Sequence, residues 1–415
     1  MKTKPLMKVD EARSRILASM PLMPGEEISI INGLGRVTHS DIISRRTQPP
    51  VALSSMDGYA VRFSDVQEIP TKLIRVGSAP AGGAYSNTLN DNDAVRIFTG
   101  GPVPDGADTI IIQENVKAES ENDGATIIVN KKPIKGQYIR SAGLDFQAGE
   151  LGIKAGRKLT ARDIGLAAAM NVAWVSVRRR PKVAILATGD EIVRPGDNIN
   201  PHQIVSSNSY TLAALIKAAG GEPIILGIAP DTIEGIQSFF ETRIGADLII
   251  TTGGASVGQH DLVQKALAKD TFGASGLDID FWRIAMRPGK PMIFGRINDT
   301  PMLGLPGNPV STMVCGLIFV KPAIRKMLGA DITNDNTTKA SLLEALPEND
   351  ERQDYVRAIY FINDAGSKVV KAFDRQDSSM MKFLTHSNCL IIRPPFDRSH
   401  IVGDEVEILE FEEGF

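Results

Sequence analysis

The sequence has little cysteine, with only Cys315 and Cys389 in 415 residues. Two thiols so far apart predict neither a disulfide framework nor a zinc cluster, and we expect both to be buried. The five histidines show no spacing typical of a metal site. No apolar run is long enough for a signal peptide or a membrane span. These absences predict a cytoplasmic protein that does not use a membrane.

The chain also lacks an excess of either charge. It has 46 basic and 49 acidic residues, which gives a formal net charge of −3. This balance provides no electrostatic reason to expect nucleic acid as a partner, so a small molecule is the better expectation. A chain of 415 residues exceeds what one hydrophobic core usually serves, and several domains are therefore expected.

The pattern of apolar residues predicts a multidomain α/β plus β protein. Helical spacing over residues 9–20 ends at two prolines, and the β-rich stretch that follows reaches about residue 138. Thr160 and Asp163 form a capping box that starts a second helix, and we expect the two helices to pack as one domain. Strand-like and helix-like segments then alternate, which predicts a parallel sheet covered by helices. Short strands return after about residue 337.

Four unusual loops follow the predicted parallel strands. Because ligands bind where the carboxyl ends of such strands meet, we expect these loops to share one edge and to form the site. Glycines in two of them remove side chains, so backbone N–H groups can approach a phosphate. The last loop leads into an apolar helix, expected over residues 312–328, whose positive end also suits an anion. The loops are residues 187–191, 229–231, 251–258 and 306–311.

Four acidic residues accompany these loops: Asp190, Glu191, Asp231 and Asp261. They would repel a phosphate by several kcal/mol at contact distance and an effective dielectric of ~20. A bridging Mg²⁺ resolves the conflict, because it shares carboxylate and phosphate oxygens and keeps waters.

Simpler interpretations stay open. The glycine-rich loops are also ordinary turn sequences, and Asp190 could cap a following helix. In the β-rich stretch, Asp57-Gly58 could be no more than a tight turn.

Seven segments, read in order, resemble the molybdopterin molybdenumtransferases, the family of bacterial MoeA and the gephyrin E domain. Each segment alone is weak evidence for the family, but seven segments in the family's order and approximate spacing are specific evidence. The resemblance covers essentially the whole chain. The segments are residues 54–61, 97–108, 139–145, 187–193, 251–261, 286–291 and 305–311.

The resemblance implies four parts, with an α/β domain like that of the adenylyltransferase MogA at the centre. It also implies a homodimer in which the β-rich insert of one chain completes the cleft of the other. The implied domains are a segmented helical linking domain (1–46 and 142–178), a β-rich insert (47–141), a molybdopterin-binding α/β domain (179–329) and a C-terminal β barrel (330–415).

The implied reaction inserts molybdate into adenylylated molybdopterin and releases AMP with the help of Mg²⁺. Further implied partners are the adenylyltransferase and cofactor-accepting proteins. The implied catalytic residues are Asp57, Thr99, Asp145, Asp190 and Glu191. The implied magnesium ligands are Glu191, Asp231 and Asp261. The implied substrate contacts are Thr188, Gly253, Gly254, Ser256, Gly258, Arg287, Lys290, Pro306, Gly307, Asn308 and Ser311.

Three alternatives remain at this stage. The chain could adenylylate molybdopterin with ATP, act as a non-catalytic scaffold on the same fold, or be a paralogue specialised for tungstate. The long insert disfavours the first, because the α/β domain alone would serve adenylylation. The clustered acids disfavour the second, because a scaffold has no need for buried like charges that cost stability.

Overall fold

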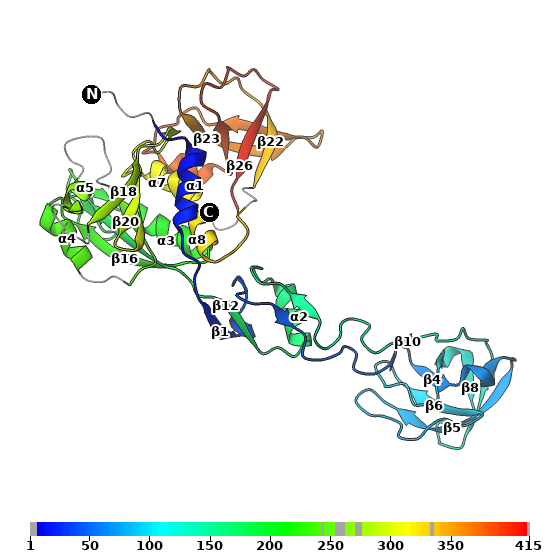
Figure 1. The fold of residues 1–415 in the computed structure, drawn as a ribbon. Helices are drawn as coiled ribbons and strands as arrows, with labels where there is room; N and C mark the ends of the chain where they lie inside the picture. Colours follow the sequence, from blue (N-terminus) through cyan, green and yellow to red (C-terminus); the bar gives the residue numbers. More distant parts are fainter. Residues whose placement is uncertain (1–5, 242–244, 254–261, 270–275, 333–335, 413–415) are drawn as a thin grey trace.

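The computed structural model describes residues 6–241, 245–253, 262–269, 276–332 and 336–412. The molecule is elongated (Figure 1): the α/β domain and the C-terminal barrel lie together at one end, and the β-rich insert lies at the other. A small linking domain stands between them. Within the described ranges, no helix has the length and apolar character needed to cross a bilayer.

The centre of the α/β domain is a six-stranded sheet. In spatial order its strands are β16 (Glu222–Ala229), β13 (Lys182–Thr188), β17 (Leu248–Thr252), β21 (Thr300–Leu305), β20 (Ile293–Ile297) and β18 (Leu277–Trp282). The first four are parallel, as expected, but β20 is antiparallel to both neighbours. The predicted parallel sheet is thus confirmed for these four strands. The sheet is mixed at its other end because only Asn298 and Asp299 separate β20 from β21, and so short a loop can join only antiparallel strands.

Helices cover both faces of this sheet. Successive residues of β13 alternate between two cores, with Val183 and Ile185 on one face and Ala184 and Leu186 on the other. The first face is covered by α3 (Asn208–Ala218), α7 (Pro309–Cys315), a π-helical turn (Gly316–Val320) and α8 (Lys321–Met327). The second is covered by α4 (Ile233–Glu241) and α5 (Leu262–Ala266).

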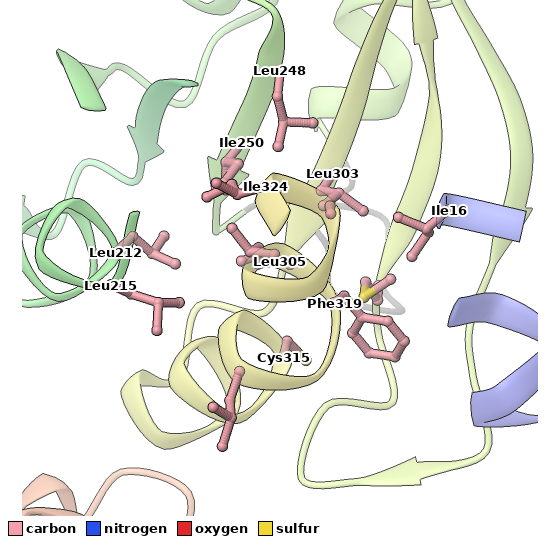
Figure 2. Close-up of a cluster of buried hydrophobic side chains, with 14 of the residues drawn as sticks. Ile16, Leu212, Leu215, Leu248, Ile250, Leu303, Leu305, Cys315, Phe319 and Ile324 are labelled. Carbon is pink, nitrogen blue, oxygen red and sulfur yellow. The ribbon is translucent and has the colours of Figure 1, made fainter. Parts of the chain in front are cut away.

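The N-terminal helix α1 (Val9–Ser19) belongs to the first of these cores. Its buried residues Val9, Ala12 and Ile16 pack with α8 and the sheet, and Figure 2 shows Ile16 in the same cluster as Phe319. The second helix, α2 (Ala161–Ala169), packs in a separate core of the linking domain. The expectation that α1 and α2 pack together is therefore wrong, because the apolar stripe of α1 is buried by segments about 300 residues away.

The linking domain is built from the two segments that flank the insert. Here β1 (Gly25–Ser29) pairs with β12 (Trp174–Arg178), and β2 (Ile42–Ile43) pairs with β11 (Leu151–Ile153). A short 3₁₀ turn (Ile30–Asn32) follows β1. The predicted capping box is confirmed, since Thr160 Oγ1 accepts from Asp163 N and the Asp163 carboxylate accepts from Thr160 N.

The insert folds around a second six-stranded sheet. Its order is β7 (Thr109–Ile112), β4 (Gly58–Val61), β6 (Asp93–Ile97), β5 (Thr71–Ala79), β9 (Thr126–Val129) and β8 (Val116–Ala118). Its 3₁₀ turns are η2 (Phe63–Val66) and η3 (Gln113–Asn115). A two-stranded pair beside the sheet joins β3 (Leu53–Ser54) to β10 (Ile139–Arg140).

The C-terminal domain is a closed five-stranded barrel, as expected. Strand β23 (Gln353–Ile362) pairs with both β24 (Lys368–Ala372) and β25 (Cys389–Arg393), and β22 (Thr337–Leu342) and β26 (Glu405–Glu410) complete the ring. The short helix α9 (Met381–His386) precedes β25. Strand β19 (Met286–Arg287) leaves the α/β domain and pairs with β23, which ties the two domains together.

Both cysteines are buried, as expected. Cys315 ends α7 in the α/β domain, and Cys389 begins β25 in the barrel. Burial raises the pKa of each thiol to about 12, which leaves both inert near neutral pH.

Candidate functional site

The four parallel strands end at one edge of the sheet. In their registers Thr188 pairs with Ala229, Ala187 with Thr252, and Thr252 with Leu305. The loops that follow these strands therefore begin side by side, as the alternating pattern predicted. Of the expected site residues, Gly254, Ser256, Gly258 and Asp261 lie outside the described ranges.

Gly253 lets the loops after β13 and β17 approach closely, and Gly307 places the loop after β21 beside them. Gly253 has φ +88°, and a Cβ on it would lie 2.5 Å from the carbonyl oxygen of Thr188. A Cβ on Gly307 would lie 3.6 Å from the Cα of Gly253. A side chain at Gly253 would therefore push these loops apart.

Two threonine hydroxyls are buried at this edge. Thr188 and Thr251 are only 4% and 1% exposed, and neither Oγ1 has a hydrogen-bond partner among the described residues. Burying a hydroxyl without a partner costs about 1–3 kcal/mol, so each is a candidate to bond a ligand or a bound water. Thr188 was expected as a substrate contact, whereas Thr251 was expected in a loop of the site but not as a contact itself. The available signal was a pair of threonines ending an otherwise aliphatic strand.

Carboxylates lie in the loops after β13 and β16. The backbone N–H of Asp231 donates to Asp190 Oδ1 at 3.1 Å, which brings the two loops together. Glu191 folds back, since a Cβ on Gly189 would lie 2.7 Å from Glu191 Oε2. All three acidic side chains are exposed, so the expectation that the clustered acids are buried is wrong for these residues, and their burial gives no argument against a scaffold. Asp190 caps no helix, because the chain continues into the short strand β14 (Ile192–Val193), which pairs with β15 (Ile204–Val205).

The loop after β21 is held from two sides. Asn208 of α3 donates to Gly307 O at 2.7 Å, and Asn308 donates to Ser378 Oγ at 2.8 Å. The helix begins at Pro309, three residues before the expected start, because the fixed φ of proline suits the first helical position. Ser311 is buried in the first turn of this helix. Ser378 therefore brings the barrel into the site, a contribution that the sequence reasoning missed.

The segment that carries Ser378 is organised by Arg357 of β23. This arginine is 1% exposed and donates to the carbonyl oxygens of Met380 at 3.0 Å and Asp377 at 2.9 Å. Burial lowers its pKa. A charged residue inside the run of apolar and aromatic residues from Tyr355 to Ile362 was the signal that could have identified it.

Arg287 and Lys290 lie elsewhere than the strand-end expectation suggested. Arg287 is bonded to Asp354, to Asp350 at 3.1 Å and to Asn349, all from the barrel side of the domain junction. Two carboxylates already neutralise its charge, which weighs against a direct role at a phosphate. Lys290 lines a cavity of about 1160 Å³ between α1, α8 and the barrel. None of the described residues lining that cavity comes from the four strand-end loops.

A second group of candidate residues lies in the insert. Asp57 Oδ1 accepts from Thr99 N at 2.7 Å and from Thr99 Oγ1 at 2.8 Å. These two bonds lower the pKa of Asp57, so its exposed carboxylate is ionised at neutral pH. Gly58 is required here, because a Cβ on it would lie 1.9 Å from the carbonyl oxygen of Ile111. The Asp-Gly sequence is thus the start of strand β4 and not a tight turn.

The structure does not bring the two groups together within one chain. Asp57 and Thr99 lie in the distal insert, while Asp190 and Glu191 lie at the edge of the α/β sheet (Figure 1). Asp145 is exposed in the connection from β10 to β11, where its N–H donates to Gln48 O at 3.0 Å.

Comparisons with known proteins cover nearly the whole chain. Three family models match in order: the MoeA N-terminal region (domain I and II) over residues 7–171, a "probable molybdopterin binding domain" over 184–326, and the MoeA C-terminal region (domain IV) over 339–411. The molybdopterin molybdenumtransferase of Haemophilus influenzae is 33% identical over 98% of both chains. That of a Nostoc species is 34% identical over 98% of this chain and 94% of its own.

The fold is also that of a solved relative. The molybdopterin biosynthesis MoeA protein from Pyrococcus horikoshii superimposes with a TM-score of 0.84 at 28% identity, over 98% of this chain and 100% of that one. Sequence and structure agree along the full length, so the chain belongs to the MoeA family of molybdopterin molybdenumtransferases.

Proposed function

We propose that this protein inserts molybdate into adenylylated molybdopterin and releases AMP. The observation that carries the proposal is the convergence of the strand-end loops, where glycines, buried hydroxyls and exposed carboxylates meet at one edge. The relatives that match its full length are molybdopterin molybdenumtransferases, which supports the same activity here. The adenylyltransferase and cofactor-accepting proteins are proposed as partners on either side of this reaction.

The phosphates of the substrate are proposed to lie against the loops after β17 and β21. Backbone N–H groups near Gly253 and Gly307 can approach an anion without a side chain in the way. The Thr188 hydroxyl supplies a donor that has no other described partner. The further proposed contacts in these loops are Gly254, Ser256, Gly258, Pro306, Asn308 and Ser311. Lys290 and Arg287 are also proposed as substrate contacts. The carboxylates paired with Arg287 weigh against a direct contact by that residue.

Magnesium is proposed to bind through Glu191 and Asp231, together with Asp261. The described residues fit such an ion, because they offer hard oxygen donors that are exposed enough for the ion to keep waters. Without a cation, two unit charges ~4 Å apart would repel by about 4 kcal/mol at an effective dielectric of 20. When bound, Mg²⁺ would offset charge on the phosphoanhydride.

The remaining chemistry is positioning. The bond that breaks is one P–O bond of the phosphoanhydride, where water attacks phosphorus and gives AMP and the phosphate of molybdopterin. The two dithiolene thiols of molybdopterin exchange their S–H bonds for bonds to molybdenum, and one oxygen of molybdate leaves with these two protons as water. Such displacement depends on orientation and charge neutralisation more than on a protein nucleophile. Asp190 holds the Asp231 loop in place through its 3.1 Å bond, and we assign no covalent role to any residue.

The cleft is proposed to be completed by the insert of a second subunit, which contributes Asp57, Thr99 and Asp145. This follows from their distance from Asp190 within one chain and from their exposure. The linking domain carries exposed apolar side chains: Trp174 is 59% exposed and pairs with Ser29, and Ile31, two residues after Ser29, is 80% exposed. Exposed large apolar groups of this kind are found at protein interfaces.

AMP release from adenylylated molybdopterin is the direct test. Release that requires Mg²⁺ and rises with molybdate is expected. Release stimulated only by tungstate would identify a tungstate paralogue, consumption of ATP would identify an adenylyltransferase, and no release with either oxyanion would favour a scaffold.

Glu191→Gln removes a proposed ligand charge at nearly constant volume. We expect turnover to fall roughly 10–100-fold with little loss of stability, because Glu191 is exposed. If stability fell as much as turnover, the result would contradict the proposed role of Glu191 as a magnesium ligand.

Mixed dimers test the shared cleft. One chain carries Asp57→Asn and the other Glu191→Gln. If the insert completes the partner's cleft, both mutations fall in one cleft and the other is wild type, so about half of the activity should remain. If each cleft used residues of one chain, both would be impaired.

A further inference from the structure

Arg96 is held between two aromatic rings beside the Asp57–Thr99 pair. It lies on β6 directly opposite Tyr59 of β4. Its guanidinium carbon is 5.3 Å from the centre of the Tyr59 ring and 4.7 Å from that of Phe98. Tyr59 is buried, whereas Phe98 is 38% exposed. Both distances are typical of a cation–π contact, so the two rings restrict the movement of the guanidinium.

The same guanidinium holds the backbone next to Asp57. One terminal nitrogen donates to Gly58 O at 2.8 Å, and the other donates to Gln113 Oε1 at 2.7 Å. The N–H of Gln113 in turn donates to Asp57 O at 3.1 Å. Arg96 therefore connects the residue after Asp57 with the residue that bonds the Asp57 carbonyl.

Arg96 leaves the carboxylate of Asp57 available. Both Thr99 bonds go to Oδ1, and within the described chain no cation forms an ion pair with Asp57. Arg96 nevertheless acts on this group by its charge, which helps to lower the pKa of Asp57 after the two Thr99 bonds. It is the one charged side chain among the described residues with this effect.

We propose that Arg96 is a positioning residue, which holds the backbone on either side of Asp57 and so orients the Asp57–Thr99 pair that the insert presents to the partner's cleft. This inference rests on the proposed function, because that function assigns Asp57 and Thr99 to the cleft. It adds a residue that touches no substrate and acts through Asp57. A planar fork that donates to two acceptors in fixed directions next to two rings explains arginine here, since the lysine ammonium has no planar fork.

The test compares three variants of the full-length protein. Arg96→Gln removes the charge and the stacking, and Arg96→Lys keeps the charge but loses the planar fork. Arg62→Gln is the matched control, because Arg62 is another insert arginine whose partners, Asp65 and Asp91, are not part of the Asp57 pair. The readouts are the pKa of Asp57 from ¹³C-carboxyl NMR, assigned by its loss in Asp57→Asn, and the pH dependence of kcat and KM for AMP release.

Arg96→Gln is expected to raise the pKa of Asp57 and to move the acid limb of kcat to higher pH. Its kcat should fall roughly 10–100-fold with a smaller change in KM, as for other residues that support a reacting group. Arg96→Lys should keep the pKa of Asp57 close to that of the wild type while kcat stays low. Arg62→Gln should change neither quantity.

An unchanged Asp57 pKa and an unchanged kcat profile in Arg96→Gln would overturn the proposal. If Arg96→Gln does not fold, the lysine variant decides, and wild-type kcat in that variant would also overturn it. Failure of the proposed function gives a different result: Asp57→Asn would leave AMP release intact, while the NMR measurement would still report whether Arg96 acts on Asp57.

Discussion

Substitution of Gly253 by alanine tests the close approach of the strand-end loops. The residue has φ +88°, which costs an L-residue about 1–2 kcal/mol. The new Cβ would lie 2.5 Å from Thr188 O and 2.9 Å from Thr188 Oγ1, and such overpacking typically costs about 1–3 kcal/mol. We expect Gly253→Ala to lower the stability of the α/β domain by about 2–5 kcal/mol.

The matched control is Gly307→Ala. Gly307 has no positive φ, and its added Cβ would make an ordinary 3.6 Å contact with Gly253. Its effect on stability should stay below about 1 kcal/mol. Both variants are expected to lower AMP release, because each adds a methyl group where a phosphate is proposed to bind. Stability therefore distinguishes them.

Cys315 provides the assay. It is fully buried in the α/β domain, so a thiol reagent reacts with it only when that domain opens. In a Cys389→Ser background, labelling across a urea series reports the α/β domain alone, which avoids treating a multidomain chain as two-state. Identical labelling of Gly253→Ala and the wild type would refute the close approach.

Two further predictions concern stability. Thr160→Ala removes the hydroxyl that caps α2 and leaves Asp163 with one capping partner fewer. We therefore expect the free energy of unfolding to fall by about 1 kcal/mol, measured by urea unfolding followed by circular dichroism. The second uses Asp350, where bonds from Arg352, together with the charge of Arg287, lower the pKa from 3.8 to about 2. Because the pKa of this carboxyl is lower in the folded state, its ionised form stabilises the fold above pH 3.8, and this stability is lost as the pH falls to about 2. In Asp350→Asn the free energy of unfolding should therefore depend less on pH in that window. An unchanged pH dependence would contradict the assignment.

Local patterns in the sequence predicted the parts of the site that depend on strand order. The loops after β13, β16, β17 and β21 follow from alternating elements, because parallel strands must end at one edge. The capping box at Thr160 likewise involves residues only three positions apart. Such features need no knowledge of distant parts of the chain.

The features that escaped prediction depend on contacts between distant segments. Ser378, in the segment that Arg357 holds, reaches the site only because the barrel packs on the α/β domain. Arg96 meets Tyr59 through the register of β4 and β6, and no spacing within the sequence encodes that pairing. The sequence alone suggested that Arg287 offers a free positive charge, but in the structure the barrel provides two carboxylate partners for it.

The packing of α1 has a consequence for synthesis of the chain. Helix α1 ends at Ser19, and its partner α8 ends at Met327, so roughly 300 residues must be made before the buried face of α1 can be covered. At about 5–20 residues per second, this interval lasts on the order of 15–60 seconds. The insert, whose sheet lies within residues 58–129, can fold meanwhile. Helix α1 is therefore made long before its apolar face is buried, and chaperones have that interval in which to bind this face.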